Sequence, residues 1–285
     1  MEGPTEHLRR QAKRIVDTAL ERVPLKAATL VGSAARGDAD FYSDLDLLLY
    51  VDELPPDGAL TQIRTAVGGT NPIARGEPTE HFCTEEFDLD GIRTEVSFVT
   101  VAGAEQRLDE LLERLEEFDS PRQKILSGVL ESLPLYGEEL VENWRGRVRD
   151  YPEPLRQAMV ERRWNFFPLW YYGDAMAARD TELWRLDVLL DAAFNMLAIL
   201  AGLNRLYFAR FELKRTRALI AKMELAPPHF ADRLESLFRL EPDPAATELG
   251  RLIEETRALV LAELPDLELP LRFPPGTRQQ PWSLR

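Results

Sequence analysis

Two carboxylates separated by one residue are the side chains of this 285-residue chain best suited to chemistry. Asp44 and Asp46 stand at the start of an apolar run that predicts a β-strand over residues 45–51. Strand side chains alternate between faces, so the two carboxylates point the same way, about 6–7 Å apart. Like charges held on one face repel each other, and a bound cation relieves the repulsion. The residues that alternate with the pair are expected to point into a core: Leu45, Leu47, Leu49 and Val51.

A glycine–serine turn precedes this pair and suggests what the cation would accompany. Gly32 and Ser33 follow an apolar segment that is expected to be a buried strand. Glycine lets the backbone approach a ligand closely, and a serine hydroxyl with neighbouring backbone N–H groups can bind phosphate oxygens. Arg36 is either a further phosphate contact or an ordinary surface arginine, and Ser43 can bind a nucleotide or support Asp44. The combination predicts a magnesium–nucleotide site.

The stretch from Val31 to Leu47 resembles the signature of the nucleotidyltransferase superfamily, whose fold is shared with DNA polymerase beta. The positions that match the minimal and antibiotic-type members are Gly32, Ser33, Arg36, Gly37, Ser43, Asp44, Asp46 and Leu47. The resemblance implies transfer of a nucleoside monophosphate from an NTP such as ATP to a hydroxyl, with release of pyrophosphate. It also implies two Mg²⁺ ions, held by the carboxylates.

Such phosphoryl transfer needs a third acid, which completes a second metal site or takes the proton from the attacking hydroxyl. Glu95 lies in the middle of a strand expected over residues 92–101, on the face that it shares with Arg93 and Ser97. The resemblance places the third acid there. The family more often has Asp at this position, so metal ligation and general-base catalysis both stay open. The alternative is an exposed glutamate paired with Arg93 or another cation. Asp88 and Asp90 flank a hairpin turn and are interpreted as turn formers.

Composition favours a globular chain without a membrane span. Hydrophobic residues make up 45% of the sequence and charged residues 29%. The single cysteine, Cys83, excludes an internal disulfide, and the polar N-terminus shows no signal peptide. The most apolar segment, Val188–Leu203, is interrupted by Asp191 and Asn195 and is too short to cross a bilayer. We therefore expect a cytoplasmic protein.

The charge is uneven along the chain. Residues 1–120 hold 25 acids and 12 bases, a net of −13, whereas residues 121–285 hold 24 acids and 23 bases, a net of −1. A strongly acidic half disfavours nucleic acid as the acceptor, because polynucleotides need a basic track. It favours a small cationic acceptor. An acidic surface that only maintains solubility would give the same excess.

The expected fold class is α+β. A nucleotidyltransferase catalytic domain, residues 1–119, would contain a small mixed β-sheet with flanking helices. A helical domain, residues 120–285, would bind the acceptor or act as a lid and end in an extended tail. From residue 120 to about 262 the pattern predicts only helices: 121–131, 137–148, 154–179, 182–206, 212–224, 228–239 and 244–262.

The helical half offers three features that could contact a substrate. Residues 161–174 contain six aromatic side chains, which can cradle a ring or pack between helices. Asp187, Asp191 and Asn195 follow each other at intervals of four and form a polar stripe that suits a substrate or hydrogen bonds between helices. Lys214 is our candidate for the donor's phosphates, with a solvated helix face as the simpler alternative.

The acceptor stays open at this point. An aminoglycoside or lincosamide fits the acidic first half and the aromatic second half. A toxin-type enzyme that modifies a protein or a tRNA end is the alternative, and a non-catalytic nucleotide-binding regulatory module is the second. A homo-oligomer is compatible with the sequence.

Overall fold

The computed structural model describes residues 2–74, 77–113, 120–176 and 179–269. The chain forms two compact units, one of Met1–Arg114 with Ile125–Asp150 and one of Leu115–Lys124 with Tyr151–Arg285. The units therefore interleave along the sequence, whereas we expected a single boundary at residue 119. The fold class is α+β, because a six-stranded mixed sheet with helices precedes a helical region.

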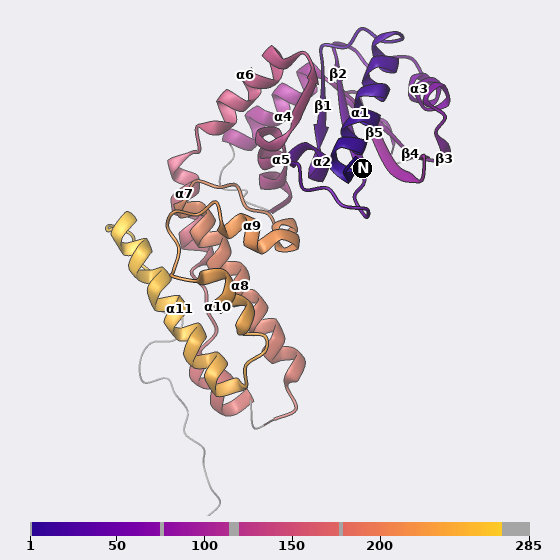
Figure 1. Cartoon of the computed structure of the whole chain (residues 1–285). Helices are drawn as coiled ribbons and strands as arrows, with labels where there is room; N and C mark the ends of the chain where they lie inside the picture. The colour runs from indigo at the N-terminus through magenta and orange to yellow at the C-terminus, as the bar shows by residue number, and fades with distance from the viewer. Residues whose placement is uncertain (1, 75–76, 114–119, 177–178, 270–285) are drawn as a thin grey trace, which may run out of the picture. The chain divides into compact units, whose positions relative to one another are not determined.

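The first unit is built on one sheet with the strand order β3-β4-β5-β2-β1-β6 (Figure 1). Only the central pair, β2 with β5, is parallel among the described strands. Its elements are α1 (Pro4–Leu20), β1 (Ala27–Val31), α2 (Gly32–Arg36), β2 (Leu45–Val51), α3 (Ala59–Val67), β3 (Thr70–Ala74), β4 (Phe82–Leu89), β5 (Ile92–Thr100), α4 (Val101–Glu113), the second part of α5 (Ser120–Glu131), β6 (Leu133–Tyr136) and α6 (Glu138–Arg149).

Alternation along β2 decides which face becomes the core. Leu45, Leu47 and Leu49 are at most 1% exposed and pack beneath α1 and α3, which cover that face (Figure 1). The opposite face of the same strand carries Asp46 at one end and Tyr50 at the other. Burial raises the pKa of Tyr50 to about 12. The predicted inward direction of the β2 leucines is confirmed.

Two strands of the sheet, β3 and β6, were not predicted from the sequence. The expectation of helices alone after residue 120 is wrong at β6, which pairs antiparallel with β1 through Leu30 and Leu133. β6 is four residues long and contains Pro134, so its own pattern is too short to predict a strand. β3 pairs with β4 and includes Asn71, whose φ is +50°. Both strands form because a neighbouring strand offers hydrogen-bonding groups.

Trp144 of α6 joins the later part of the first unit to its sheet. Its ring lies 4.7 Å from the ring of Tyr50 in an edge-to-face arrangement, and it is 2% exposed. We expect Trp144→Ala to lower the free energy of unfolding by about 3–5 kcal/mol, because a large buried side chain leaves a cavity. Urea unfolding of the full chain would measure the loss. Leu183→Ala, at a side chain that is 84% exposed, is the control and should change stability little. Equal effects of the two variants would contradict this packing.

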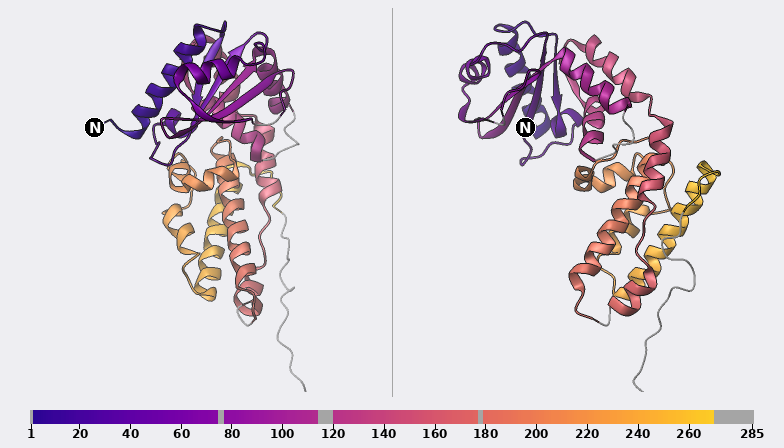
Figure 2. Two further views of the ribbon diagram at one scale, coloured as in Figure 1. Left: turned by 90° about the vertical axis from the view of Figure 1, so that its right-hand side faces the viewer. Right: turned by 180° about the vertical axis from the view of Figure 1, so that it is seen from behind.

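The second unit is helical. It contains the first part of α5, then α7 (Glu153–Arg163), a π-helix η1 (Tyr171–Met176), α8 (Glu182–Leu203), a 3₁₀-helix η2 (Arg210–Arg215), α9 (Thr216–Ile220), α10 (Phe230–Ser236) and α11 (Pro242–Glu263). α8 packs against α7 and α11 (Figure 2). The single helix expected over 154–179 is wrong, because α7 ends at Arg163 and Trp164 leaves the helical conformation. The expected tail lies outside the described residues from 270 onward.

One helix of the part that the structure describes, α8, is long and apolar enough to cross a membrane by length and composition. Of its apolar 18-residue window, 72% is buried inside the protein. Buried core helices share this composition, and the packing of α8 against α7 and α11 accounts for it.

Candidate active site

Asp46 and Glu95 occupy neighbouring positions on the sheet. Asp46 on β2 pairs in parallel register with Glu95 on β5, and both residues are half-buried. Paired residues of adjacent strands point to the same face, with strands about 4.8 Å apart. Asp44 is exposed and stands one residue before β2 begins. The structure therefore places Asp46 and Glu95 side by side, and Asp44 directly before the first residue of β2.

Arg93 is paired with β4 and not with Glu95. Its guanidinium forms ion pairs with Glu86 and, at 3.2 Å, with Asp88. Within the described ranges, no ion pair of Glu95 is found. The interpretation of Glu95 as a glutamate neutralised by Arg93 is therefore wrong.

Glu86 is a further acid of this face that the sequence analysis missed. It pairs with Glu95 in the antiparallel register of β4 and β5 and is only 6% exposed. Asp46, Glu95 and Glu86 thus form one row across three strands. Two adjacent glutamates, Glu85 and Glu86, must point to opposite faces of β4, but the strand order decides which one faces the site. Glu85 is bound by Arg64 of α3 on the other face.

The backbone of Gly32 lies against the Asp46 carboxylate. Gly32 directly follows Val31, which pairs with Asp46 across β1 and β2. It has φ of +76°, and a Cβ added there would lie 3.2 Å from Asp46 Oδ2. Both the left-handed conformation and the close approach favour glycine. The glycine–serine turn and the carboxylate pair, separate in sequence, therefore meet at one point.

Gly37 closes the short helix α2 that carries Ser33. Its φ is +89°, and the backbone N–H groups of Gly37 and Asp38 donate to the carbonyl oxygen of Ser33 at 3.0 and 3.1 Å. Such left-handed C-terminal caps are a common use of glycine. The resemblance includes Gly37 by its spacing, and the structure gives it this conformational role.

Arg36 and Ser43 are both engaged within the protein. Arg36 forms ion pairs with Asp38 at 3.5 Å and with Glu131 at 3.4 Å. The hydroxyl of Ser43 donates to Asp40 Oδ1 at 3.2 Å and accepts from the Asp40 N–H at 2.9 Å. Ser43 therefore closes the turn of residues 40–43, and its hydroxyl bonds to Asp40.

Lys214 belongs to η2 of the second unit, among other cations. Its Nζ lies 5.8 Å from the centre of the Phe211 ring, and Lys124 Nζ lies 4.2 Å from the same ring. Lys124, on α5, was not predicted, because the two lysines are ninety positions apart in the sequence.

Two arginines lie near a second ring of that unit. The guanidinium carbons of Arg163 and Arg210 lie 4.8 and 5.4 Å from the centre of the Phe194 ring. Burial, and then the charge of Arg210, lowers the pKa of Arg163. Two cations this close together favour an anion beside them, and the Asp191 carboxylate acts on Arg163 in the opposite direction to Arg210.

The aromatic segment and one member of the polar stripe, Asn195, make contacts within the helical unit, whereas Asp187 and Asp191 are exposed. Phe167 contacts the rings of Tyr171 and Trp184 at 5.5 and 5.6 Å. Asn195 donates to the Asn165 carbonyl oxygen at 2.8 Å. For the aromatic segment and Asn195, these contacts support the interpretation as packing between helical segments.

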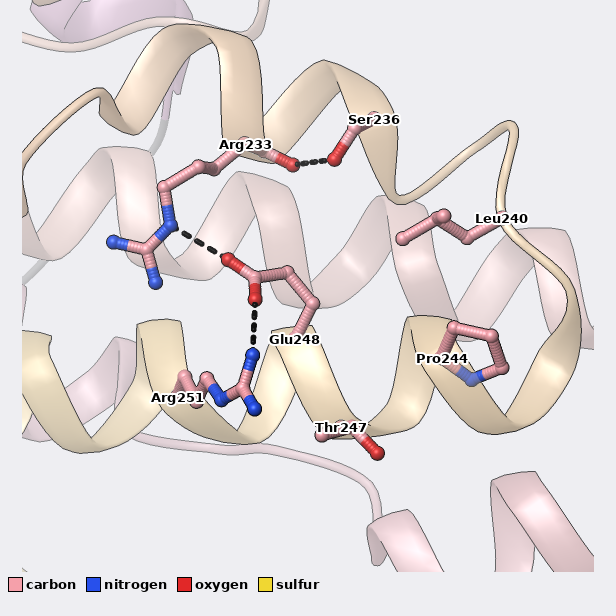
Figure 3. A pocket seen from close by; sticks show the side chains of 7 residues that line it. All are labelled: Arg233, Ser236, Leu240, Pro244, Thr247, Glu248 and Arg251. Atoms are coloured by element: carbon pink, nitrogen blue, oxygen red, sulfur yellow. Dashed lines mark hydrogen bonds and ion pairs between the residues drawn. The ribbon is translucent and has the colours of Figure 1, made fainter.

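A pocket of about 490 Å³ lies between α10 and α11 of the second unit (Figure 3). Its lining residues are Arg233, Ser236, Leu240, Pro244, Thr247, Glu248 and Arg251. Glu248 accepts from Arg233 at 2.6 Å and from Arg251 at 3.3 Å, and Arg233 also pairs with Glu255 at 2.6 Å, so two acids balance the two arginines. None of the predicted site residues lines this pocket.

The carboxylates suit a hard cation. Carboxylate oxygens are the protein ligands that Mg²⁺ prefers, and the missing Cβ at Gly32 leaves room beside Asp46 Oδ2. Across the described residues, no group of three or more His, Cys, Asp or Glu side chains lies close enough together to hold a metal ion. Asp46 and Glu95 nevertheless fit such an ion by chemistry and by their adjacent register.

Comparison with known proteins identifies the first part of the chain. Residues 12–120 match the family model of the nucleotidyltransferase domain. No curated protein matches at a significant level. A crystal structure of a nucleotidyltransferase-like protein from Exiguobacterium sibiricum is similar with 12% identity and a TM-score of 0.37, over 88% of this chain and 74% of that chain.

The family match includes the Gly32–Ser33 turn, the Asp44–Asp46 pair and Glu95, and proteins of this family generally use divalent metal ions and an NTP. It confirms the resemblance seen in the sequence. Residues 12–120 therefore match the nucleotidyltransferase domain of the DNA polymerase beta-like superfamily, and a domain of this kind implies a transferase of the nucleotidyltransferase class.

Proposed function

We propose that this nucleotidyltransferase moves a nucleoside monophosphate from an NTP to a hydroxyl of a small acceptor and releases pyrophosphate. The observation that carries the proposal is the parallel pairing of Asp46 with Glu95 next to the backbone of Gly32. Charges that would repel each other are placed side by side at the turn where phosphates would bind. Adjacent like charges destabilise the folded chain, whereas they suit the binding of Mg²⁺ for phosphoryl transfer.

The carboxylates of Asp44, Asp46 and Glu95 would hold two Mg²⁺ ions. Bound Mg²⁺ supplies charge neutralisation at the triphosphate and acidifies a coordinated hydroxyl. The acceptor oxygen forms its bond to the α-phosphorus while the bond from that phosphorus to pyrophosphate breaks. Glu95 either ligates metal or accepts the proton of the acceptor hydroxyl. The protein's main contribution is to position and stabilise these charges.

Phosphate contacts are proposed for several of the predicted residues. The Gly32–Ser33 turn would bind phosphate oxygens with its backbone and hydroxyl. Arg36 would exchange a carboxylate partner for phosphate, and Ser43 would support the nucleotide through the 40–43 turn. Lys214 is proposed for the donor's phosphates, and its cationic surroundings support that role.

The acceptor that we propose is a small cation such as an aminoglycoside or lincosamide. The net charge of −13 over residues 1–120 supports it, since an acidic surface attracts cations. The same charge argues against a tRNA end, although a toxin-type enzyme that modifies a protein stays the alternative. The catalytic assignment to residues 1–119 and the acceptor-binding assignment to residues 120–285 are part of this proposal. So are a cytoplasmic location and the absence of a membrane partner.

Mass spectrometry of acceptors tests this function directly. The full chain would be incubated with Mg²⁺ and each NTP in turn, together with aminoglycosides, lincosamides, tRNA and candidate proteins. We expect a small cationic acceptor to gain the mass of one nucleotide. A gain on tRNA or on a protein alone would favour the toxin-type alternative. No gain on any acceptor, together with no nucleotide binding in calorimetry, would favour the regulatory module.

A further inference from the structure

Helix α1 holds the loop that carries the phosphate-binding turn. The Arg9 guanidinium donates from Nε to the Ala34 carbonyl oxygen and from Nη2 to the Ala35 carbonyl oxygen, both at 2.8 Å. The N–H of Ala39 donates to the Thr5 hydroxyl at 3.2 Å. Three main-chain groups within six residues are thus bound by two side chains of one helix.

The two side chains lie one helical turn apart. Thr5 and Arg9 are separated by four residues, so they share a face of α1. The helix has 17 residues, and Leu8, Ala12 and Ile15 anchor it in the core of the first unit. The loop is therefore tied to a rigid element and not only to its own neighbours.

The held segment needs this support. α2 has five residues, and isolated helices shorter than about 12 residues are marginal in water. Its first residues are Gly32 and Ser33, and the carbonyl groups bound by Arg9 are near its other end. A cation there also interacts favourably with the partial negative charge of a helix C-terminus.

The family match begins at residue 12, so Thr5 and Arg9 lie outside it. We propose that Arg9, assisted by Thr5, is a positioning residue that sets the Gly32–Ser33 turn for nucleotide binding. Arg9 acts through the backbone of α2. The inference rests on the proposed role of that turn in binding the NTP.

Steady-state kinetics on the full chain separate positioning from general stability. Arg9→Ala should raise the KM for the NTP by about tenfold and change kcat by less than about twofold, because it weakens ground-state and transition-state binding alike. Arg9→Lys should restore part of the affinity, since one donor remains. Arg10→Ala is the matched control. Arg10 is the next residue on α1, 57% exposed, and contacts Glu2.

Hydrogen exchange gives a readout that does not depend on turnover. The amides of Gly37 and Asp38 should exchange faster in Arg9→Ala than in Arg10→Ala. Both donate to the Ser33 carbonyl oxygen of α2, a helix that Arg9 holds through the carbonyl oxygens of Ala34 and Ala35. Thr5→Val removes one acceptor and should raise the KM about threefold, with faster exchange at Ala39 alone. Thr5→Val therefore provides a second test of the inference if Arg9→Ala lowers the melting temperature of the unit.

Two outcomes would overturn the inference. In the first, Arg9→Ala and Thr5→Val have the same KM and the same exchange pattern as Arg10→Ala. In the second, Arg9→Ala and Thr5→Val exchange faster but keep the KM of Arg10→Ala, which would show that the contacts stabilise the loop without affecting nucleotide binding. Asp46→Asn distinguishes either failure from failure of the proposed function. If Asp46→Asn keeps its activity, the site assignment itself fails. If it is inactive, the site stands and only the role of Arg9 is rejected.

Discussion

Asp46→Asn is expected to lower magnesium-dependent NTP consumption by at least about a thousandfold, the loss typical of removing a charge that stabilises the transition state. The substitution keeps the size of the side chain and removes its charge. Asp46 is the residue that joins the two halves of the site, because it pairs with Glu95 on β5 and lies against Gly32. Asp44→Asn should have an effect of the same order if it holds the same ion.

Release of pyrophosphate, measured across a Mg²⁺ titration, would report the loss. The matched control is Asp52→Asn, directly after the other end of β2, where the side chain is 67% exposed and pairs with Lys26 at 2.8 Å. This control should keep its activity. Turnover by Asp46→Asn within tenfold of the unchanged protein would refute the assignment of the metal site.

Gly32→Ala is expected to lower kcat/KM for the NTP by about a hundredfold, because the added methyl group meets the Asp46 carboxylate at 3.2 Å. A residue with a Cβ at a φ of +76° also costs about 1–2 kcal/mol of stability. The two effects differ in kind. The strain destabilises the fold, whereas the contact moves a carboxylate.

Gly68→Ala separates these effects. Gly68 has φ of +79° at the end of α3, and an added Cβ there would have no described atom within 4 Å. It should show the same loss of stability in a thermal melt and full activity in the kinetic assay. If the two alanine variants lost activity equally, crowding of Asp46 would not be the cause.

Local sequence patterns were sufficient to predict the strands that carry Asp46 and Glu95, but they did not predict how these side chains are arranged, and they missed Glu86. The limits of β2, residues 45–51, follow from the apolar run after Asp44, and Gly32 follows from the turn. Alternation alone put Glu95 on a polar face. Its position beside Asp46 depends on the parallel pairing of β2 with β5, which no local pattern encodes.

The features that the sequence did not predict depend on contacts between distant parts of the chain. Arg36 pairs with Glu131, which is 95 positions away, so its partner depends on the tertiary fold. β6 forms on an existing strand, and α7 ends before Pro168 because residue 164 adopts a non-helical conformation. Arg9 looks in sequence like any other charged residue of an amphipathic helix. Only the carbonyl groups opposite it reveal its contact with the loop.

The last strand of the sheet has a consequence for anyone who wishes to produce the domain in isolation. β6 lies beyond residue 120, where the family match stops, and it covers the hydrogen-bonding edge of β1. A fragment cut at residue 120 would leave that edge bare, and bare edges pair with other chains and aggregate. A fragment reaching Asp150 would retain β6 and Trp144 of α6. A fragment that keeps the sheet complete therefore extends about thirty residues past the end of the family match.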